Sequence, residues 1–204
     1  MAFVDKHGVL DSLGRRGEIV VDLGCGERKR EGAIGIDRVE HDSVDLTGDA
    51  IQILGAFPDA SIDRVVSSHF VEHLPDVAAL VDLLARKVRP GGAIEIVVPH
   101  FTNPYFHSDP THRSSFGLYT FCYFCRSTLF RREVPSYVRR PQLRLARVDL
   151  VFKASRPFYL RHALRRLAGA LFNSNAFFQE LYEDCFSYWF PCYEIRYRIE
   201  RVSE

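Results

Sequence analysis

Two short stretches of the sequence hold residue types that could carry chemistry. The first, "SSHFVEHLPD" (67–76), contains His69, Glu72 and His73 in the pattern H-x-x-E-H. On a helix these side chains share one face, so the pattern matches the ligands of one class of zinc peptidases. A peptidase would also need a third ligand and a substrate cleft, and we identify neither in the sequence. We therefore interpret the pattern as one that binds no metal.

The second stretch is "HFTNPYFHSDPTHRSSFGLYTFCYF" (100–124), with His100, His107, Asp109 and His112 among phenylalanines and tyrosines. Histidine and aspartate can move protons, and aromatic side chains can keep water out of a pocket. The "DPTH" turn predicts that Asp109 orients His112, which is our preferred general base, with His107 and then His100 as the next candidates. Two alternatives stay open: the histidines satisfy buried backbone groups, or they hold a divalent ion with Asp109.

The elements that must position these residues alternate between strands and a helix. The ranges 18–23, 33–37, 43–46, 62–68 and 93–99 predict strands, and "PDVAALVDLLARKV" (75–88) has the apolar spacing of a helix. This order predicts an open, largely parallel sheet in an α/β fold.

The second half predicts an antiparallel strand pair, 142–153 with 193–202, separated by a helical insertion. Apolar residues in that insertion follow helical spacing at Leu160, Leu164, Leu167, Ala168 and Leu171. We expect the leucines to pack on the sheet and the neighbouring arginines to face water.

A Gly-rich turn follows the first of these strands. In "VVDLGCG" (20–26), Gly24 and Gly26 allow a tight turn and close approach of a ligand, and "GID" (35–37) ends in Asp37, which could hold ribose hydroxyls. The third glycine of G-x-G-x-x-G is missing and Asp37 follows closely, so the pattern disfavours a dinucleotide.

Residues 18–100 resemble the class I S-adenosylmethionine-dependent methyltransferases. The resemblance rests on "VVDLGCG", "GID", "GDA", "IDRVVSSHFVEHL" and "VRPGGAIEIVVP", which stand in that family's order. It implies a Rossmann-like sheet of seven strands, mostly parallel, whose last strand is antiparallel. We expect a single domain over 1–204, with a cofactor-binding half (18–100), an acceptor region with the sixth strand and the helical insertion (100–192), and the last strand (193–202).

The resemblance also implies roles for individual residues. The methionine part of the cofactor is lined by the Gly-rich turn, Asp37 binds the ribose, Arg38 lies beside the adenine, and "GDA" borders the adenine ring. Near the sulfonium, the resemblance places the end of the fourth strand, and Glu72 and His73 open the next helix without metal. The implied cofactor residues are Asp22, Gly24, Cys25, Gly26, Asp37, Arg38, Asp49, Ala50, Ser68 and His69. Between Gly26 and Asp37 there is room for little more than one helical turn, and we expect the charged run 28–30 to be solvated.

The pattern "VPHF…DPTH…F" is similar to that of small methyltransferases associated with glycan assembly. It implies transfer to a hydroxyl of a saccharide or another hydroxylated small molecule. Two alternatives stay open: a nucleic-acid methyltransferase that uses the basic segment 126–166, or a cofactor-binding fold that serves only as an interaction module.

Charge and cysteine content suggest a location and a partner. The N-terminus lacks the apolar stretch of a signal peptide and the five cysteines are odd in number, so we expect a cytoplasmic protein with free thiols. For Cys122 and Cys125 we expect burial among aromatics. Segment 126–166 holds 12 Lys and Arg but 2 acidic residues, which predicts peripheral contact with an anionic partner such as a lipid surface.

Overall fold

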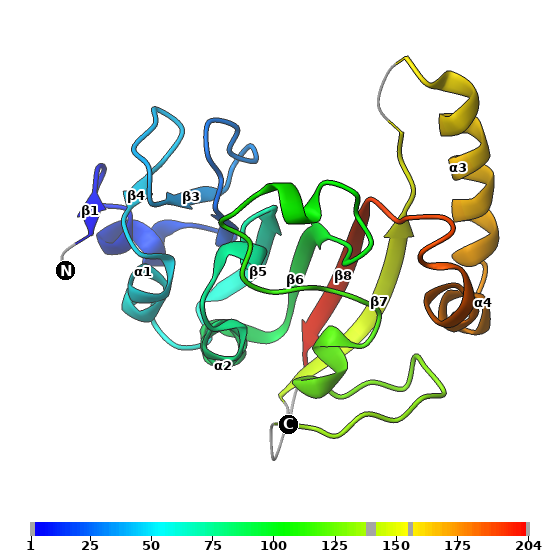
Figure 1. The fold of residues 1–204 in the computed structure, drawn as a ribbon. Coiled ribbons are helices and arrows are strands. Elements are labelled where there is room, and N and C mark those ends of the chain that lie inside the picture. Colours follow the sequence, from blue (N-terminus) through cyan, green and yellow to red (C-terminus); the bar gives the residue numbers. More distant parts are fainter. Residues whose placement is uncertain (1–2, 138–141, 155–156, 203–204) are drawn as a thin grey trace.

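A computed structural model describes residues 3–137, 142–154 and 157–202 of the chain. Its centre is an eight-stranded sheet with the order β1-β4-β3-β2-β5-β6-β8-β7 (Figure 1). Strands β2 to β6 are parallel to one another, β8 is antiparallel to both β6 and β7, and β1 is antiparallel to β4. The bounds are Val4–Asp5 (β1), Val20–Leu23 (β2), Ile34–Asp37 (β3), Leu46–Thr47 (β4), Ile62–Ser68 (β5), Val88–Pro99 (β6), Leu143–Val151 (β7) and Glu194–Arg201 (β8).

This sheet confirms the predicted α/β fold and its antiparallel last strand. Each predicted strand has a counterpart, but β4 shares only Leu46 with the predicted range 43–46, and β6 begins at Val88 where the prediction began at 93. Strand β1 is a short edge strand that was not predicted. Because parallel strands all end at the same edge, the turns after β2, β3, β5 and β6 meet there.

Two helices belong to the first half of the chain. Helix α1 (Ala50–Ala56) was not predicted, although Asp49 caps it by accepting a hydrogen bond from Gln52 N. Helix α2 (Val77–Lys87) lies within the predicted range and is capped by the carboxylate of Asp76, which accepts a hydrogen bond from Ala79 N. The caps satisfy backbone N–H groups that a helix leaves free at its start.

Two more helices, α3 (Tyr159–Phe172) and α4 (Ala176–Leu181), lie between β7 and β8 in the chain. Helix α3 occupies the range with predicted helical spacing, but its leucines do not pack on the sheet. Leu160, Leu164, Leu167 and Leu171 are all exposed, and Phe172 is the buried residue of this helix. That expectation was therefore wrong: the stripe exists, but no described element covers it.

The two faces of the sheet differ in character. One face contributes Val21, Val65, Ile94 and Ile199 to the hydrophobic core, and adjacent strands pair these positions directly. The next positions along the strands point to the opposite face and form a charged groove of about 720 Å³. The groove is lined by Asp22, Arg28, Arg30, Val66, Ser67, Ser68, Glu95, Ile96, Val97, Arg147, Asp149, Arg196, Tyr197 and Arg198.

Candidate active site at the carboxyl edge of the sheet

The Gly-rich turn leaves β2 at the carboxyl edge. Gly24 and Gly26 have φ angles of +68° and +52°, a region that strains other residues. The N–H groups of Gly24 and Cys25 both donate to the carbonyl of Ile36 in the next strand, which fixes the turn against β3. A Cβ on Gly26 would meet no atom within 4 Å, so space for a ligand lies beside this residue.

Gly24 has a second constraint that the sequence did not show. A Cβ at this position would stand 2.4 Å from Cβ of Phe70, because the Phe70 side chain packs directly on the glycine. A larger residue at 24 would displace Phe70 as well as strain the backbone. Substitution of Gly24 is therefore a poor way to test cofactor binding alone.

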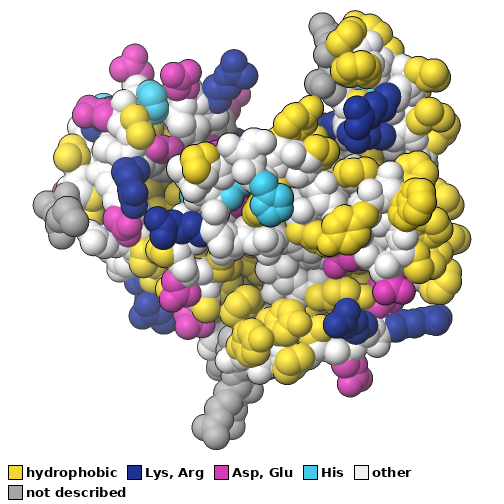
Figure 2. Space-filling view, in the orientation of Figure 1, with side chains coloured by type: hydrophobic (Ala, Val, Ile, Leu, Met, Phe, Trp, Pro, Cys, Tyr) yellow, Lys and Arg dark blue, Asp and Glu magenta, His cyan; other side chains and the backbone are white. Residues whose placement is uncertain are grey.

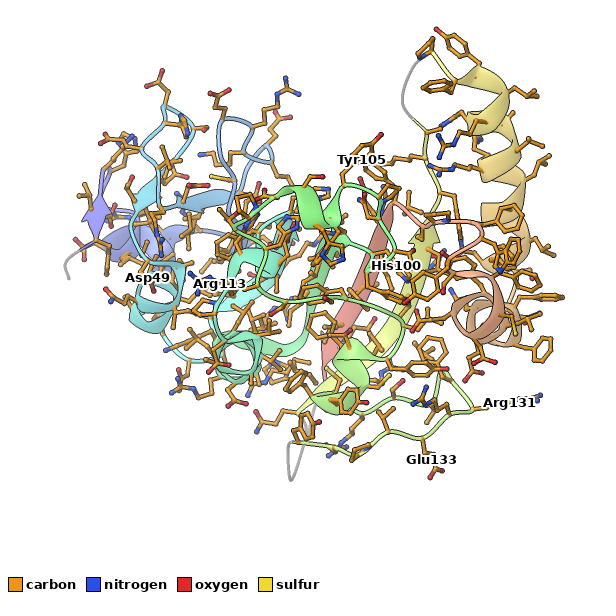
Figure 3. The ribbon with its side chains drawn as sticks, in the orientation of Figure 1. Asp49, His100, Tyr105, Arg113, Arg131 and Glu133 are labelled. Atoms are coloured by element: carbon orange, nitrogen blue, oxygen red, sulfur yellow. The ribbon has the colours of Figure 1, made fainter. Side chains whose placement is uncertain are left out.

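Asp37 lies at the end of β3, where its carboxylate joins two turns. One oxygen accepts from Gly26 N at 2.9 Å and the other from Val39 N at 2.9 Å. Each carboxylate oxygen keeps a second lone pair for a ligand hydroxyl. Asp49 caps α1 nearby (Figure 3) and lies 3.7 Å from the guanidinium of the exposed Arg38, while Ala50 is buried as the first residue of the helix.

In the charged run after the Gly-rich turn, Arg28 and Arg30 are exposed, as expected, whereas Lys29 is partly buried. Lys29 forms an ion pair with Asp45 at 2.7 Å. The backbone N–H of Arg30 donates to the buried carboxylate of Asp22 at 2.8 Å, and the Arg30 side chain lines the charged groove together with Arg28. Two guanidinium groups therefore lie close to the Gly-rich turn.

The end of β5 carries a charged histidine. His69 has a φ of +54° and lies between two carboxylates, with Nε2 3.5 Å from Glu194 and Nδ1 3.4 Å from Glu72. The nearby carboxylates of Glu194 and then Glu72 raise the pKa of His69 to about 9. Burial opposes ionisation of Glu194, but His69 and Lys153 outweigh it and lower the pKa of Glu194 to about 2. His69 is thus an imidazolium at neutral pH and cannot accept a proton there.

Glu194 is a site residue that the sequence analysis missed. It begins the last strand, β8, which lies far from His69 in the sequence. Pairing of Pro99 with Glu194 in the β6–β8 ladder brings it to the end of the sheet next to β5. No local motif marks it, because its position depends on strand order alone.

Glu72 and His73 lie in a separate 3₁₀ turn, Val71–His73, and do not open α2, which begins at Val77. This corrects the expectation from the family resemblance. The Glu72 side chain is fully buried, and neither of its oxygens has a hydrogen-bond partner. His69 supplies its opposite charge at 3.4 Å without the geometry of a hydrogen bond. A buried carboxylate with free lone pairs is costly unless a charge compensates it.

The loop after β6 brings two histidines to Glu72. His112 Nδ1 donates to the carbonyl of Phe106 at 2.8 Å, which leaves Nε2 as the acceptor atom of an uncharged ring. The prediction that Asp109 orients His112 was wrong, since Nε2 lies 3.7 Å from that carboxylate. Asp109 instead accepts from the Thr111 hydroxyl at 2.6 Å, and the same hydroxyl oxygen lies 2.8 Å from His73 Nδ1.

It follows that Asp109 orients His73 through Thr111. The Thr111 proton points to Asp109, so His73 Nδ1 must donate to Thr111 and its Nε2 is also left as an acceptor. The rings of His73 and His112 lie 4.9 Å apart. Hydrogen bonds that fix Nδ1–H and free Nε2 are typical of histidines that bind metals or accept protons.

Glu72, His73 and His112 form a group that has room for a cation. One ligand atom from each lies within 4.8 Å of the others. Ligands of a tetrahedral zinc ion lie roughly 3.4 Å apart, given bonds of about 2.1 Å, so the side chains would have to close inward. The same arrangement can serve a proton acceptor without any movement.

The other two predicted bases differ sharply from His112. His100 is fully buried, with Nδ1 2.7 Å from Thr102 Oγ1 and Nε2 3.3 Å from Glu183 (Figure 3). It therefore satisfies buried polar groups and cannot contact a bound acceptor. His107 is exposed beside Phe106, and Tyr105 projects from the same loop at the upper edge with 60% of its surface exposed (Figure 3).

The aromatic residues of this loop divide between a small pocket and the core. Phe101, Phe116, Tyr119 and Tyr123 line a pocket of about 230 Å³ together with Glu183. Phe106, Phe116 and Phe121 are buried in the core. Cys125 is buried with them and Cys122 is partly buried, and both are free thiols, as expected. The buried phenylalanines thus anchor the loop, and the polar residues between them lie at the carboxyl edge of the sheet.

Comparisons with known proteins agree with this architecture. Residues 28–96 match the model of a family described as a methyltransferase domain. This match and the fold make the chain similar to the S-adenosylmethionine-dependent methyltransferases of class I. A search of curated proteins found no match.

Solved structures of methyltransferases share the fold. A SAM-dependent methyltransferase from Archaeoglobus fulgidus is 21% identical, with a TM-score of 0.57 over 95% of this chain and 93% of that one. A putative methyltransferase from Bacillus halodurans is 15% identical, with a TM-score of 0.56 over 97% of this chain and 100% of that one. Phosphoethanolamine N-methyltransferase 2 from Haemonchus contortus, solved with S-adenosyl-L-methionine, is 14% identical with a TM-score of 0.51; the match covers 96% of this chain and 52% of that one.

The described residues at this edge fit S-adenosylmethionine as a cofactor. Open space lies beside Gly26, and Asp37 presents a carboxylate at the end of the next strand. Arg28 and Arg30 offer positive charge to the cofactor's carboxylate, in a groove that also includes Asp22 and Ser68. No described helix lies between the Gly-rich turn and β3. These arginines therefore take the place where the start of a helix would otherwise supply N–H donors.

Proposed function

We propose that this methyltransferase transfers a methyl group to a hydroxyl oxygen of a saccharide or a similar hydroxylated small molecule. His112 acts as the general base, and the acceptor lies at the carboxyl edge between the loop after β6 and the end of β5. The observation that carries the proposal is the hydrogen bond from His112 Nδ1 to the Phe106 carbonyl, which turns Nε2 into a fixed acceptor.

The chemistry favours an acceptor that must lose a proton. Bound S-adenosylmethionine supplies an electrophilic methyl group, and its thioether leaves with the electron pair of the broken C–S bond. An alcohol is a weak nucleophile until its proton is removed, and a positioned histidine contributes about 10²–10⁴-fold. The proton of the acceptor hydroxyl would pass to His112 Nε2 as the O–C bond forms. Alignment of the acceptor contributes a further large factor.

Different residues would contact different parts of the cofactor. Asp37 would hold the ribose hydroxyls, with Arg38, Asp49 and Ala50 at the adenine. At the end of β5, the carboxylates of Glu72 and Glu194 are balanced by His69 and by Lys153, whose ammonium lies 2.6 Å from Glu194. His69 therefore screens the two carboxylates and does not take part in proton transfer.

The basic segment 126–166 does not favour a nucleic-acid acceptor. Among the residues of this segment that the structure describes, the charges are spread over a loop, β7 and α3. Arg144 and Arg147 are paired with Glu200 and Asp149 at 2.5 and 2.8 Å. Exposed Tyr105 at the carboxyl edge instead suits the apolar face of a sugar ring. We also propose that the protein works at the periphery of a membrane.

Release of S-adenosylhomocysteine across saccharide, lipid and RNA acceptors tests the proposal. With the best acceptor, His112→Ala should lower turnover by about 10²-fold or more and leave cofactor affinity unchanged. His107→Ala, which removes an exposed histidine of the same loop, is the matched control and should keep full turnover. Preference for RNA, or full activity of His112→Ala on a hydroxyl acceptor, would contradict the proposal.

A further inference from the structure

Helix α3 presents an apolar stripe to solvent. Leu160, Leu164, Leu167 and Leu171 recur at helical spacing, and their exposed fractions are 76%, 59%, 68% and 52%. Residues that follow this spacing lie on one face of a helix. Apolar surface of this extent on a soluble domain marks an interaction site more often than chance exposure.

The stripe continues onto neighbouring elements. Tyr188 and Trp189, each 81% exposed, precede β8, and Phe177 of α4 is 51% exposed. Figure 2 shows hydrophobic side chains gathered over the α3 and α4 region, with a group of Lys and Arg side chains against the upper part of α3. Tyrosine and tryptophan, which have an apolar body and a polar tip, are enriched where a protein meets the boundary of a lipid bilayer.

The charges on α3 have one sign. Residues 159–172 include Arg161, Arg165 and Arg166 and no acidic residue. Arg165 donates to the backbone carbonyl of Lys153, so its role is partly structural, whereas Arg161 and Arg166 are exposed. An acid-free helix with an apolar stripe complements an anionic surface, and two copies of it would repel each other if the stripes paired.

The position of α3 connects this surface with the active site. In Figure 1, α3 rises beyond the carboxyl edge of the sheet, on the side of the turns that follow β3 and β5. A surface that contacts α3 would therefore lie beside the acceptor region. None of the described helices has the length and hydropathy of a membrane span.

We propose that α3, together with Tyr188 and Trp189, docks the protein on an anionic lipid surface. The leucines enter the boundary between headgroups and acyl chains, and Arg161 and Arg166 contact lipid phosphates. This inference does not depend on the acceptor, although it favours one that is carried by a lipid.

Trp189 is the single tryptophan of the chain and provides a direct probe. We expect its fluorescence to shift to shorter wavelength with vesicles of phosphatidylcholine and phosphatidylglycerol, but not with phosphatidylcholine alone. The protein should cosediment with the anionic vesicles, and higher salt should weaken this because charges are screened over about 8 Å at physiological ionic strength.

Paired variants separate the two contributions. Leu164→Ser with Leu167→Ser, and Arg161→Glu with Arg166→Glu, should each lower vesicle affinity by about tenfold or more. The controls are Val39→Ser and Arg15→Glu with Arg16→Glu, which change exposed residues elsewhere and should bind like wild type. Circular dichroism should show that every variant keeps its fold.

Two results would overturn the proposal. One is the absence of binding to either vesicle type at low salt. The other is a wild-type dimer, seen by sedimentation, that the leucine variant converts to a monomer; the stripe would then be an interface between two copies. Methyl transfer to a soluble acceptor is measured separately, so failure here would leave the proposed function untouched.

Discussion

Helices α2 and α3 have the same kind of sequence pattern and opposite surroundings. In α2, Leu80 and Leu84 are 0% and 1% exposed, and the helix packs within the core of the cofactor-binding half. In α3, Leu160 and Leu164 are 76% and 59% exposed. Helical spacing tells which residues share a face, but it does not tell what covers that face.

The reason lies in how each helix is attached. Helix α2 connects two parallel strands that are neighbours, so its apolar face must return to the sheet. Helix α3 follows β7 at the sheet's edge and is anchored near its end, where Phe172 is buried and Asn173 bonds to the backbone of Leu150. An edge strand leaves the following helix free to project.

Stability measurements test this difference between α2 and α3, and we expect the largest effect in α2. Leu84→Ala should lower the free energy of unfolding by about 2–5 kcal/mol, because it leaves a cavity in the core. Leu164→Ala should change it by less than about 0.5 kcal/mol, because the side chain is exposed and alanine is a good helix former. Urea denaturation followed by circular dichroism gives both values. Equal losses would show that the α3 stripe is covered in solution.

A second prediction concerns the place where the two halves meet, at Glu72, His73 and His112. If His112 is the base, chelator-treated protein should keep its turnover. Added Zn²⁺ should occupy the cluster and lower turnover by about 10²-fold or more, because it removes the base. Glu72→Gln should need more Zn²⁺ for the same inhibition, and His107→Ala should respond like wild type. Activity that is lost with chelator and restored by Zn²⁺ would instead make the cation part of the enzyme.

The smallest expected effect tests the cofactor-binding half by itself. Asp37→Asn should weaken S-adenosylmethionine binding by about tenfold, because charge-assisted hydrogen bonds to the ribose are worth roughly 1.5–3 kcal/mol. Asp42→Asn, at an exposed aspartate nearby, is the control. Calorimetry measures both, and equal affinity for the two variants would remove Asp37 from the site. Variants of α3 should leave this affinity unchanged.

The sequence by itself determined the parallel sheet and the cofactor edge. Strands β2 to β6 and the turn at Gly24 and Gly26 depend on local patterns, namely β-branched runs, glycines with positive φ and an acid at a strand end. Such patterns express steric limits of nearby residues, so they can be recognised without knowing the fold. Helix α1 was not predicted because its apolar run is short, although its N-cap residue, Asp49, belongs to the "GDA" motif.

Only the tertiary structure decided which side chains meet. Glu194 reaches His69 because β8 inserts beside β6, and Asp109 turns out to orient His73 through Thr111 and not His112. The burial of His100 and the exposure of the α3 leucines likewise depend on segments distant in the chain. Contacts of this kind are set by strand order and loop path, which nearby residues do not encode, and they determine which residues of this protein are free to act.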